Sequence, residues 1–564
     1  MKDQKKLDNN KNVEMDLEQT GENNNEFTNN NLDDQIFKQK SKFYIMEKHK
    51  IKIIIGLFIF IFVLLIIFLY ICFNNREKHK LDEDNSCQIG GNEKCAICDQ
   101  NKNQCAKCNP GYLLYNNKCL INYSFKLLYK TSKDNEIISL SKFLIDNFKE
   151  IMIDDIFVNS YMNYTFSFIG NHSIYILLDL SNCKSLSYMF YGMKNIISIN
   201  FSPLFKTENI THMNHIFCEC ISLTSVDISN FDTKRVTDMN NMFSNCTSLT
   251  FINISNINSR NVLYMNNMFY NCHKLKTINT SNFITNNVID LKSFFHNCYS
   301  LEYISISNFN TENVMNMSYM FCNCNSLKSL NVSNFNTKNV ITMRNIFSNC
   351  FQLTSIDISK FNTQNVIDMS YMFSVCEKLE SIDISSLQTK NVKYMDKIFI
   401  FCARLKTVII GNINTDNLIS MNYMFTSCSN LINIDISKLK TNRVEDMSNL
   451  FAYCSKLTSI NVSNFNTKNV KDINSMFKGC SSLTSIDLSN FNTNKVINMH
   501  NIFEACPSLS YIDISSFTSD TNSNINLSDF LSGFGVIKIN SNFVKYINNT
   551  IPSNWTIIII SPQK

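Results

Sequence analysis

The feature that most constrains the fold of this chain is a repeat with a period of 26 residues. Cysteine recurs at this spacing from Cys220 to Cys506, and the register does not slip over twelve units. Phenylalanine occupies every position of a second column, from Phe217 to Phe503. A fixed period of this length predicts identical units that stack on one another to form a solenoid.

One unit combines two kinds of apolar spacing. Residues 239–246 have apolar side chains at i, i+3, i+4 and i+7, which predicts a short helix with Asp238 as its N-cap. Ile252 and Ile254 then alternate with the polar Asn253, which predicts a strand. Eight apolar positions cannot offset the entropy of ordering 26 residues, so a unit is stable only when its neighbours complete its core.

The repeat resembles the BspA-like branch of leucine-rich repeats, which occurs in surface proteins of mycoplasmas, other bacteria and some protists. The resemblance covers about residues 183–517 and is carried by the unit NMSYMFCNCNSLKSLNVSNFNTKNV at 316–340. It implies a curved α/β solenoid with one strand and one short helix per repeat. It also implies adhesion or partner binding at a cell surface, and it brings no catalytic residue. The first unit, 186–219, is degenerate, with one residue inserted near Pro203.

The N-terminal part of the chain predicts a membrane anchor. Residues 1–50 are polar and lack a periodic apolar pattern, which predicts a disordered tail. Residues 53–73 are 21 uncharged apolar residues, long enough to cross a bilayer once, and we expect an anchor over 51–74. A cleaved signal peptide is the alternative, but its apolar region would be shorter and nearer the N-terminus.

The charges on either side of the apolar run predict its orientation. Six lysines precede it, and three basic residues, soon followed by acidic ones, come after it: Lys38, Lys40, Lys42, Lys48, Lys50 and Lys52 against Arg76, Lys78 and Lys80. Basic residues stay on the cytoplasmic side, so we expect a cytoplasmic N-terminus and an extracellular C-terminus at the plasma membrane.

A cysteine-rich segment over 87–120 supports an extracellular location. Its six cysteines are spaced C-x7-C-x2-C-x6-C-x2-C-x10-C, and they are Cys87, Cys95, Cys98, Cys105, Cys108 and Cys119. An even number in a short segment with almost no apolar core predicts disulfides. A zinc site built from the two CxxC pairs is the alternative, although the gap between the pairs is short and no histidine contributes. The segment loosely resembles cysteine-rich modules of growth-factor-receptor and EGF-like ectodomains.

Two further segments are expected to close the ends of the solenoid. Residues 121–182 contain short runs with strand-like alternation and predict a β-rich N-terminal cap. Residues 518–564 follow the last repeat and are expected to form a C-terminal cap. Such caps are needed because an end unit would otherwise expose its core.

The candidate binding residues lie on the outward side of the predicted strands. Most positions there are Ser, Thr, Asn or Asp, and a solvated polar surface is the ordinary interpretation. Apolar residues on such a surface are informative. We therefore expect binding of a protein or glycan partner through three apolar and three acidic residues, namely Phe251, Tyr303, Ile409, Asp357, Asp383 and Asp435.

We expect the repeated cysteines and methionines to pack in the core and not to take part in redox chemistry or metal binding. Each cysteine shares the predicted helix face with Met and Phe, so we expect twelve buried free thiols. His212, His215, Cys218 and Cys220 lie close together but do not form a convincing metal site, because His215 and Cys218 occupy outward positions of the repeat. We expect no metal and no cofactor.

Several classes of function are disfavoured by the sequence. The net charge of +5 is small and the basic residues are scattered, which argues against nucleic-acid binding. No nucleophile–base set or phosphate loop is present, so we do not expect an enzyme. A self-associating coat protein and a receptor that signals through the short tail remain as alternatives to adhesion. Fourteen N-x-S/T sequons are present, about as many as this composition produces by chance.

Overall fold

The computed structural model describes residues 123–158, 164–203, 205–518, 534–544 and 551–561, together with the backbone of four short strands in 95–121. The chain divides into two compact units, 1–107 and 108–564. In the cysteine-rich segment, β1 (Cys95–Asp99) and β2 (Gln104–Cys108) form one two-stranded sheet, and β3 (Tyr112–Tyr115) and β4 (Lys118–Ile121) form another, antiparallel one.

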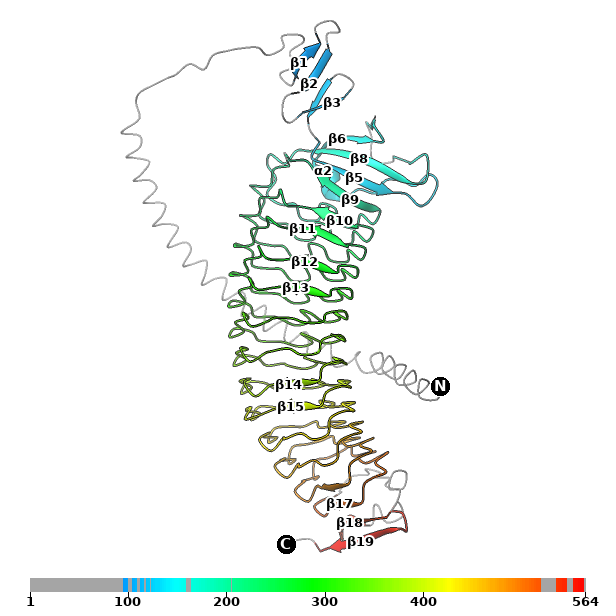
Figure 1. Ribbon diagram of the computed structural model, residues 1–564, viewed down its shortest axis with the longest axis vertical. Coiled ribbons are helices and arrows are strands. Elements are labelled where there is room, and N and C mark those ends of the chain that lie inside the picture. The colour runs from blue at the N-terminus through cyan, green and yellow to red at the C-terminus, as the bar shows by residue number, and fades with distance from the viewer. Residues whose placement is uncertain are drawn as a thin grey trace, which may run out of the picture. The chain divides into compact units, whose positions relative to one another are not determined.

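The repeats form a β-solenoid of about 13 coils that follow one another in chain order (Figure 1). A ladder of isolated parallel bridges marks the coils, running from Ser185 to Asn498 with one bridge between each coil and the next. The inserted residue predicted in the first unit is present. The hydrogen bond from the Thr211 hydroxyl to the Lys184 carbonyl spans 27 residues, whereas the equivalent bond from Thr237 to Thr211 in the next coil spans 26.

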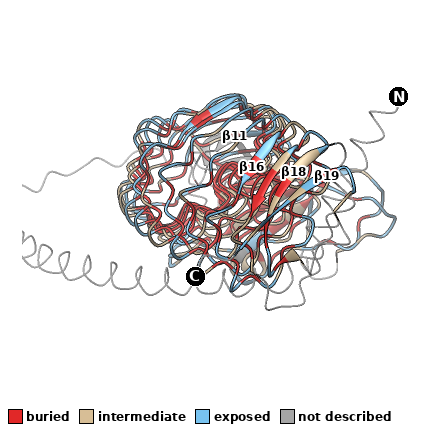
Figure 2. Cartoon of the chain, turned by 90° about the horizontal axis from the view of Figure 1, so that it is seen from below, coloured by how far each residue is buried: buried red, intermediate tan, exposed pale blue. Residues whose placement is uncertain are grey.

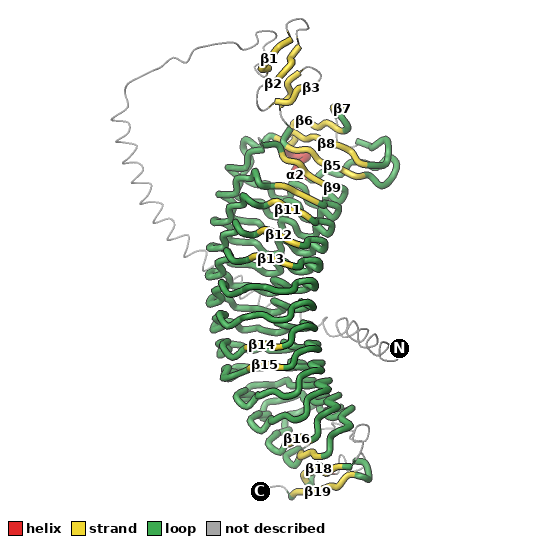
Figure 3. The backbone as a smooth tube through the Cα atoms, viewed as in Figure 1, coloured by secondary structure: helices red, strands yellow, loops and turns green. Residues whose placement is uncertain are grey.

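Most coils have one short strand segment, and these segments lie on the same side of the solenoid (Figure 3). These segments are parallel and pair residue for residue, as in Val226 with Ile252. Four coils between β13 and β16 have the same extended segment without an assigned strand. The assigned strands are β9 (Ile196–Phe201), β10 (Ser225–Asp227), β11 (Phe251–Asn253), β12 (Thr277–Asn279), β13 (Tyr303–Ser305), β14 (Ser381–Asp383), β15 (Thr407–Ile409) and β16 (Ser485–Asp487).

The predicted helix in each repeat is wrong. Residues 239–246 and their equivalents form a chain of tight turns, which we call the turn segment (Figure 3). Helices packed side by side need about 8–10 Å between their axes. Here the stacked Phe rings of successive coils are only 5.0–6.1 Å apart from Phe217 to Phe503, so there is no room for helices.

Hydrogen bonds between coils replace the bonds of a helix in the turn segment. The amides of Met239, Asn241, Phe243 and Asn245 each donate to a carbonyl of the next coil over 2.8–3.0 Å. To aim every second amide at the neighbouring coil, the backbone turns left-handed at Asn241 (φ 54°) and Asn245 (φ 62°). Asparagine tolerates this conformation better than most residues, which gives a structural reason for part of the abundant asparagine in the repeats.

The interior of the solenoid is built from columns of identical residues, and buried stretches lie inside the stacked coils (Figure 2). The Phe, Met, Leu and Cys columns form one continuous core. A buried column of Thr, with one Ser, bridges the coils on another side: the Thr415 hydroxyl donates to the Lys440 carbonyl (2.8 Å) and accepts from the Lys440 amide (2.7 Å).

An antiparallel cap covers the first coil, within the residues where we expected an N-terminal cap. β5 (Phe125–Lys130) pairs with β9 on one side and with β8 (Asn171–Leu178) on the other, which extends the solenoid sheet into the order β11-β10-β9-β5-β8-β6-β7. β6 (Phe148–Ile153) and the two-residue β7 (Ile156–Phe157) complete it. α2 (Lys142–Asn147) is the helix of the described residues, with Leu144 buried.

The other end of the solenoid has longer strands. β17 (Tyr511–Ile514), β18 (Gly535–Asn540) and β19 (Trp555–Ile560) continue the parallel order from β16 and form a separate four-stranded sheet with it. The side chains of Ile537 and Ile539 on β18 are fully buried on the inner side of these strands. The predicted anchor, 51–74, lies outside the described residues. Among the residues that are described, no helix is long and apolar enough to cross a membrane.

Candidate binding face of the solenoid

The outward side chains of the strand segments form a regular polar surface, which we call the strand face. Inward residues such as Ile252 and Ile382 are buried, while the residues on either side of them point to solvent. Three apolar side chains interrupt this surface, and each is at least half exposed: Phe251 (59%), Tyr303 (52%) and Ile409 (50%). All three are residues that the sequence predicted as anchors.

These apolar residues do not form one cluster. Phe251 on β11 and Tyr303 on β13 lie two coils apart, about 10 Å at the usual strand spacing. Ile409 on β15 lies four coils further along, about 19 Å from Tyr303 by the same spacing. Its neighbour in register is Asp383 on β14. The face therefore offers an aromatic pair at one place and an isoleucine beside a carboxylate at another.

Tyr303 is held in place by a charged pair. The Lys328 ammonium lies 5.2 Å from the centre of the Tyr303 ring and 2.7 Å from a Glu302 carboxylate oxygen. The bond with Glu302 raises the pKa of Lys328, and the same bond lowers the pKa of Glu302. Tyr303 and Lys328 are exposed and Glu302 is partly exposed, so the arrangement orients the ring more than it stabilises the fold.

The acidic residues of the strand face have a structural role that the sequence did not reveal. Asp357, Asp383 and Asp435 each accept the backbone amide of the serine two residues further on, over 2.8–2.9 Å. These bonds from Ser359 and Ser437 hold the pKa of Asp357 and Asp435 below the usual range. The same turn is made by Asn331 and Asn461 in other coils. The carboxylates are exposed, but each one first closes the turn that follows the extended segment of its own coil.

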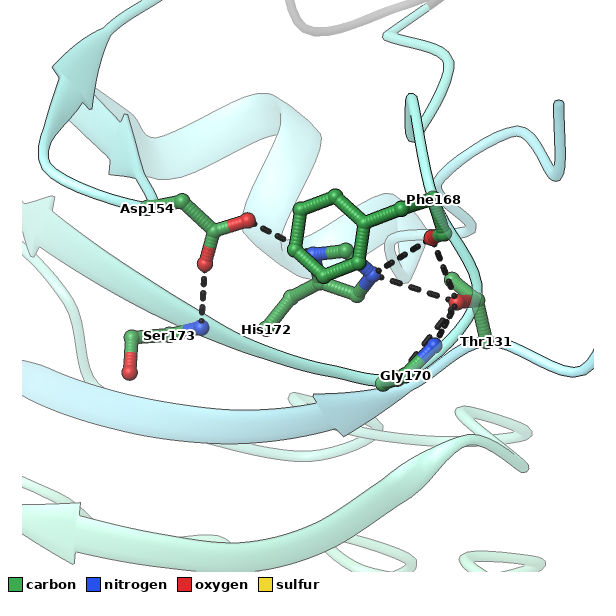
Figure 4. Close-up of polar contacts among 6 residues, drawn as sticks. All are labelled: Thr131, Asp154, Phe168, Gly170, His172 and Ser173. Carbon is green, nitrogen blue, oxygen red and sulfur yellow. Dashed lines mark hydrogen bonds and ion pairs between the residues drawn. The ribbon is translucent and has the colours of Figure 1, made fainter. Parts of the chain in front are cut away.

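A buried polar network in the cap was also missed (Figure 4). His172 is 1% exposed and lies 2.6 Å through Nδ1 from Asp154, in the turn between β6 and β7. Its Nε2 lies 3.1 Å from the Thr131 hydroxyl and 3.2 Å from the Phe168 carbonyl oxygen. Since strand alternation places residue 172 on the same inward side as Ile174 and Ile176, the sequence did contain a signal for this burial.

The order Asp–His–Thr is that of a hydrolytic triad, but this network holds loops together. Thr131 is fully buried, and its hydroxyl already accepts the Gly170 amide (3.0 Å) and faces the Phe168 carbonyl (3.2 Å). The second Asp154 oxygen accepts the Ser173 amide (2.8 Å). A substrate could not reach the hydroxyl, and the bonds tie three loops to the start of β8.

The twelve repeated cysteines are buried free thiols. Each donates to the carbonyl of a phenylalanine in the preceding coil, as Cys246 does to Phe217 (3.1 Å). Burial raises the pKa of the thiols, to about 12 for Cys376 and Cys454. These cysteines do not share a helix face, as the sequence predicted, because the turn segment takes the place of the helix. The thiols are instead occupied by bonds to the neighbouring coil.

The remaining predicted site residues give no further site. The predicted outward position of Cys218 is wrong, because this residue is buried like Cys220, and burial raises the pKa of Cys218 to about 11. His215 stacks on the exposed Tyr188 ring, with centroids 4.6 Å apart. No group of three or more possible metal ligands occurs within the described residues. The side chains of Cys95, Cys98, Cys105, Cys108 and Cys119, and all of Cys87, lie outside the described residues, so the disulfides stay a prediction.

Some solved structures are similar to this chain. A leucine-rich cell-surface protein from Faecalibacterium prausnitzii is 18% identical, with 62% of this chain and 83% of that chain covered and a TM-score of 0.27. A leucine-rich repeat protein from Eubacterium ventriosum is 19% identical, with 56% of this chain and 83% of that chain covered and a TM-score of 0.32. The functional domain of InlJ from Listeria monocytogenes, described as including a cysteine ladder, is 12% identical. The match covers 65% of this chain and 76% of that chain, with a TM-score of 0.18.

No curated protein matches the sequence. One family model does, in four overlapping segments at 184–303, 272–379, 325–434 and 419–539. These segments cover the solenoid, and together they make up more than half of the chain. They are also the residues in which the sequence resembles BspA-like repeats. The chain therefore belongs to the family described as "Mycoplasma protein of unknown function, DUF285".

Proposed function

We propose that this chain is a cell-surface protein, without enzymatic activity, that binds a protein or glycan partner through its strand face. The observation that carries the proposal is the exposure of Phe251 and Tyr303 on an otherwise polar surface. A large aromatic side chain left in water at a rigid position is typical of a binding anchor. The lysine over the Tyr303 ring keeps it in one orientation before a partner arrives.

The proposed topology rests on the sequence. The apolar run at 53–73, the lysines before it and the six cysteines that follow it all support a single-pass protein with an extracellular solenoid. Protease treatment of intact cells that carry the full chain tests this topology. Loss of the repeats from the cells is expected, whereas repeats that survive until the membrane is opened would contradict an extracellular location.

The binding proposal is tested by a triple variant of the full chain, Phe251→Ser with Tyr303→Ser and Ile409→Ser. A matched control replaces Ile221, Tyr453 and Ile497, which are 39%, 46% and 68% exposed but lie outside the strand segments. Cells that display each form are compared for attachment to a glycan array and to plates coated with extracellular-matrix extract. We expect attachment to fall at least tenfold for the strand-face variant alone. Equal attachment by both variants, or none by the unmodified chain, would refute the proposal.

A further inference from the structure

Within the described part of the chain, the last strand of the C-terminal four-stranded sheet has a neighbour on one side only. Among the described residues β19 ends the order β16-β17-β18-β19, and it pairs with β18 along all six of its residues without a bulge. The outer edge of such a strand carries a row of backbone donors and acceptors that a further strand can pair with. What fits this edge is therefore a β-strand.

The sequence of β19 has none of the features that usually protect an edge. It reads Trp-Thr-Ile-Ile-Ile-Ile from Trp555 to Ile560, with no charge and no proline. Ile558 and Ile559 are 41% and 58% exposed. The seven-stranded sheet at the N-terminal end of the solenoid, by contrast, ends in β7, which is only two residues long. Very short strands and charged residues are the common means of blocking an edge, and β19 uses neither.

The edge is also rigidly held, and one group beside it lacks a partner. The Trp555 side chain is buried against Gly535, where an added Cβ would lie only 2.6 Å from the indole ring. The indole Nε1 has no hydrogen-bond partner, although Trp555 is only 6% exposed. The indole ring packs against β18, so the edge strand is anchored on its inner side.

We infer that β19 pairs with β19 of a second copy of this chain, antiparallel about a two-fold axis. An uncharged strand opposes no like charges when it meets itself, and antiparallel backbone bonds are self-complementary. An axis perpendicular to the sheet keeps Ile557 and Ile559 of both copies on the same side of the joined sheet. Each copy then covers the exposed end of the other. This interface lies at the end of the solenoid and is independent of the strand face.

The test uses the full chain, made as two differently tagged copies in the same cell. A photo-crosslinking residue replaces Ile558 in one of them. We expect a product that carries both tags and whose crosslinked peptide includes β19 of the second copy. The control places the same residue at Ile497, which is 68% exposed but lies outside the strand segments, and we expect no such product.

A second variant separates pairing from folding. Ile558→Lys with Ile559→Lys puts charges on an exposed edge without removing buried side chains, so thermal unfolding is expected to be unchanged. The doubly tagged product, crosslinked from Thr556, is expected to fall at least tenfold, whereas Ile497→Lys leaves it unchanged. Absence of the product from the unmodified chain, its persistence in the lysine variant, or a crosslink to a different protein would each overturn the inference.

Discussion

Replacing Thr415 by valine tests how much the bonds through the buried hydroxyl column add to the apolar core and to the backbone bonds of the turn segment in holding the coils together. Thr415 is 1% exposed, and its hydroxyl both donates to and accepts from the backbone of Lys440 in the next coil. Valine has nearly the same shape but makes neither bond. Each buried backbone group left unpaired costs about 1–3 kcal/mol. Because the Lys440 side chain is at the surface and lets water approach, we expect a loss of about 2 kcal/mol.

Hydrogen exchange followed by mass spectrometry measures this loss locally. A cost of about 2 kcal/mol corresponds to roughly 30-fold faster exchange of the amides in residues 436–444, if this region opens as a unit. The control is Thr354→Val, whose side chain is exposed, and its exchange is expected to stay within about twofold. The reasoning is refuted if Thr415→Val changes exchange by less than threefold, or if the two variants behave alike.

Three further predictions concern other parts of the repeat. Asn297 is left-handed (φ 62°) and its side-chain amide donates to the side-chain oxygen of Asn271, so Asn297→Ala should lower stability by about 1–3 kcal/mol while Asn297→Gly costs less. Equal thermal unfolding temperatures for the two variants would contradict this. Because the pKa of Asp357 and of Asp435 is lower in the folded state, both carboxylates stabilise the fold at pH values above the ordinary pKa of 3.8. This contribution is lost as the pH falls through the lower pKa of the folded state. Asp357→Asn with Asp435→Asn should therefore weaken the acid dependence of unfolding, and an unchanged pH profile would count against it. The twelve repeated thiols should not react with a thiol reagent at pH 8 until the protein is denatured, since burial raises their pKa, and disulfides between coils would be incompatible with this.

The sequence predicted the architecture well because its period is a direct record of stacking. The Cys, Phe and Leu columns gave the number and order of the coils, and the inserted residue of the first unit was visible as a shift in register. The strand face was predictable for the same reason, since alternation around Ile252 placed Phe251 outward. Exposure of an anchor follows from local alternation and needs no knowledge of distant contacts.

The turn segment was mispredicted because two structures share its apolar spacing. Residues at i, i+3, i+4 and i+7 face one side of a helix, but they also face one side of the left-handed turn chain. The distance between coils decides which one forms, and that distance is a property of the whole stack. The role of His172 was missed for a related reason. Its partners Asp154 and Thr131 are 18 and 41 residues away, and no repeat points to them.

The direction of the bonds in the turn segment has a consequence for how the protein is made. The amides of Met239, Asn241, Phe243 and Asn245 all donate to the following coil, which a ribosome delivers later. At about 5–20 residues per second, each 26-residue coil waits roughly 1–5 s for its acceptors. During translation the newest coil is always unfinished, and the boundary between finished and unfinished coils moves toward the C-terminus one repeat at a time.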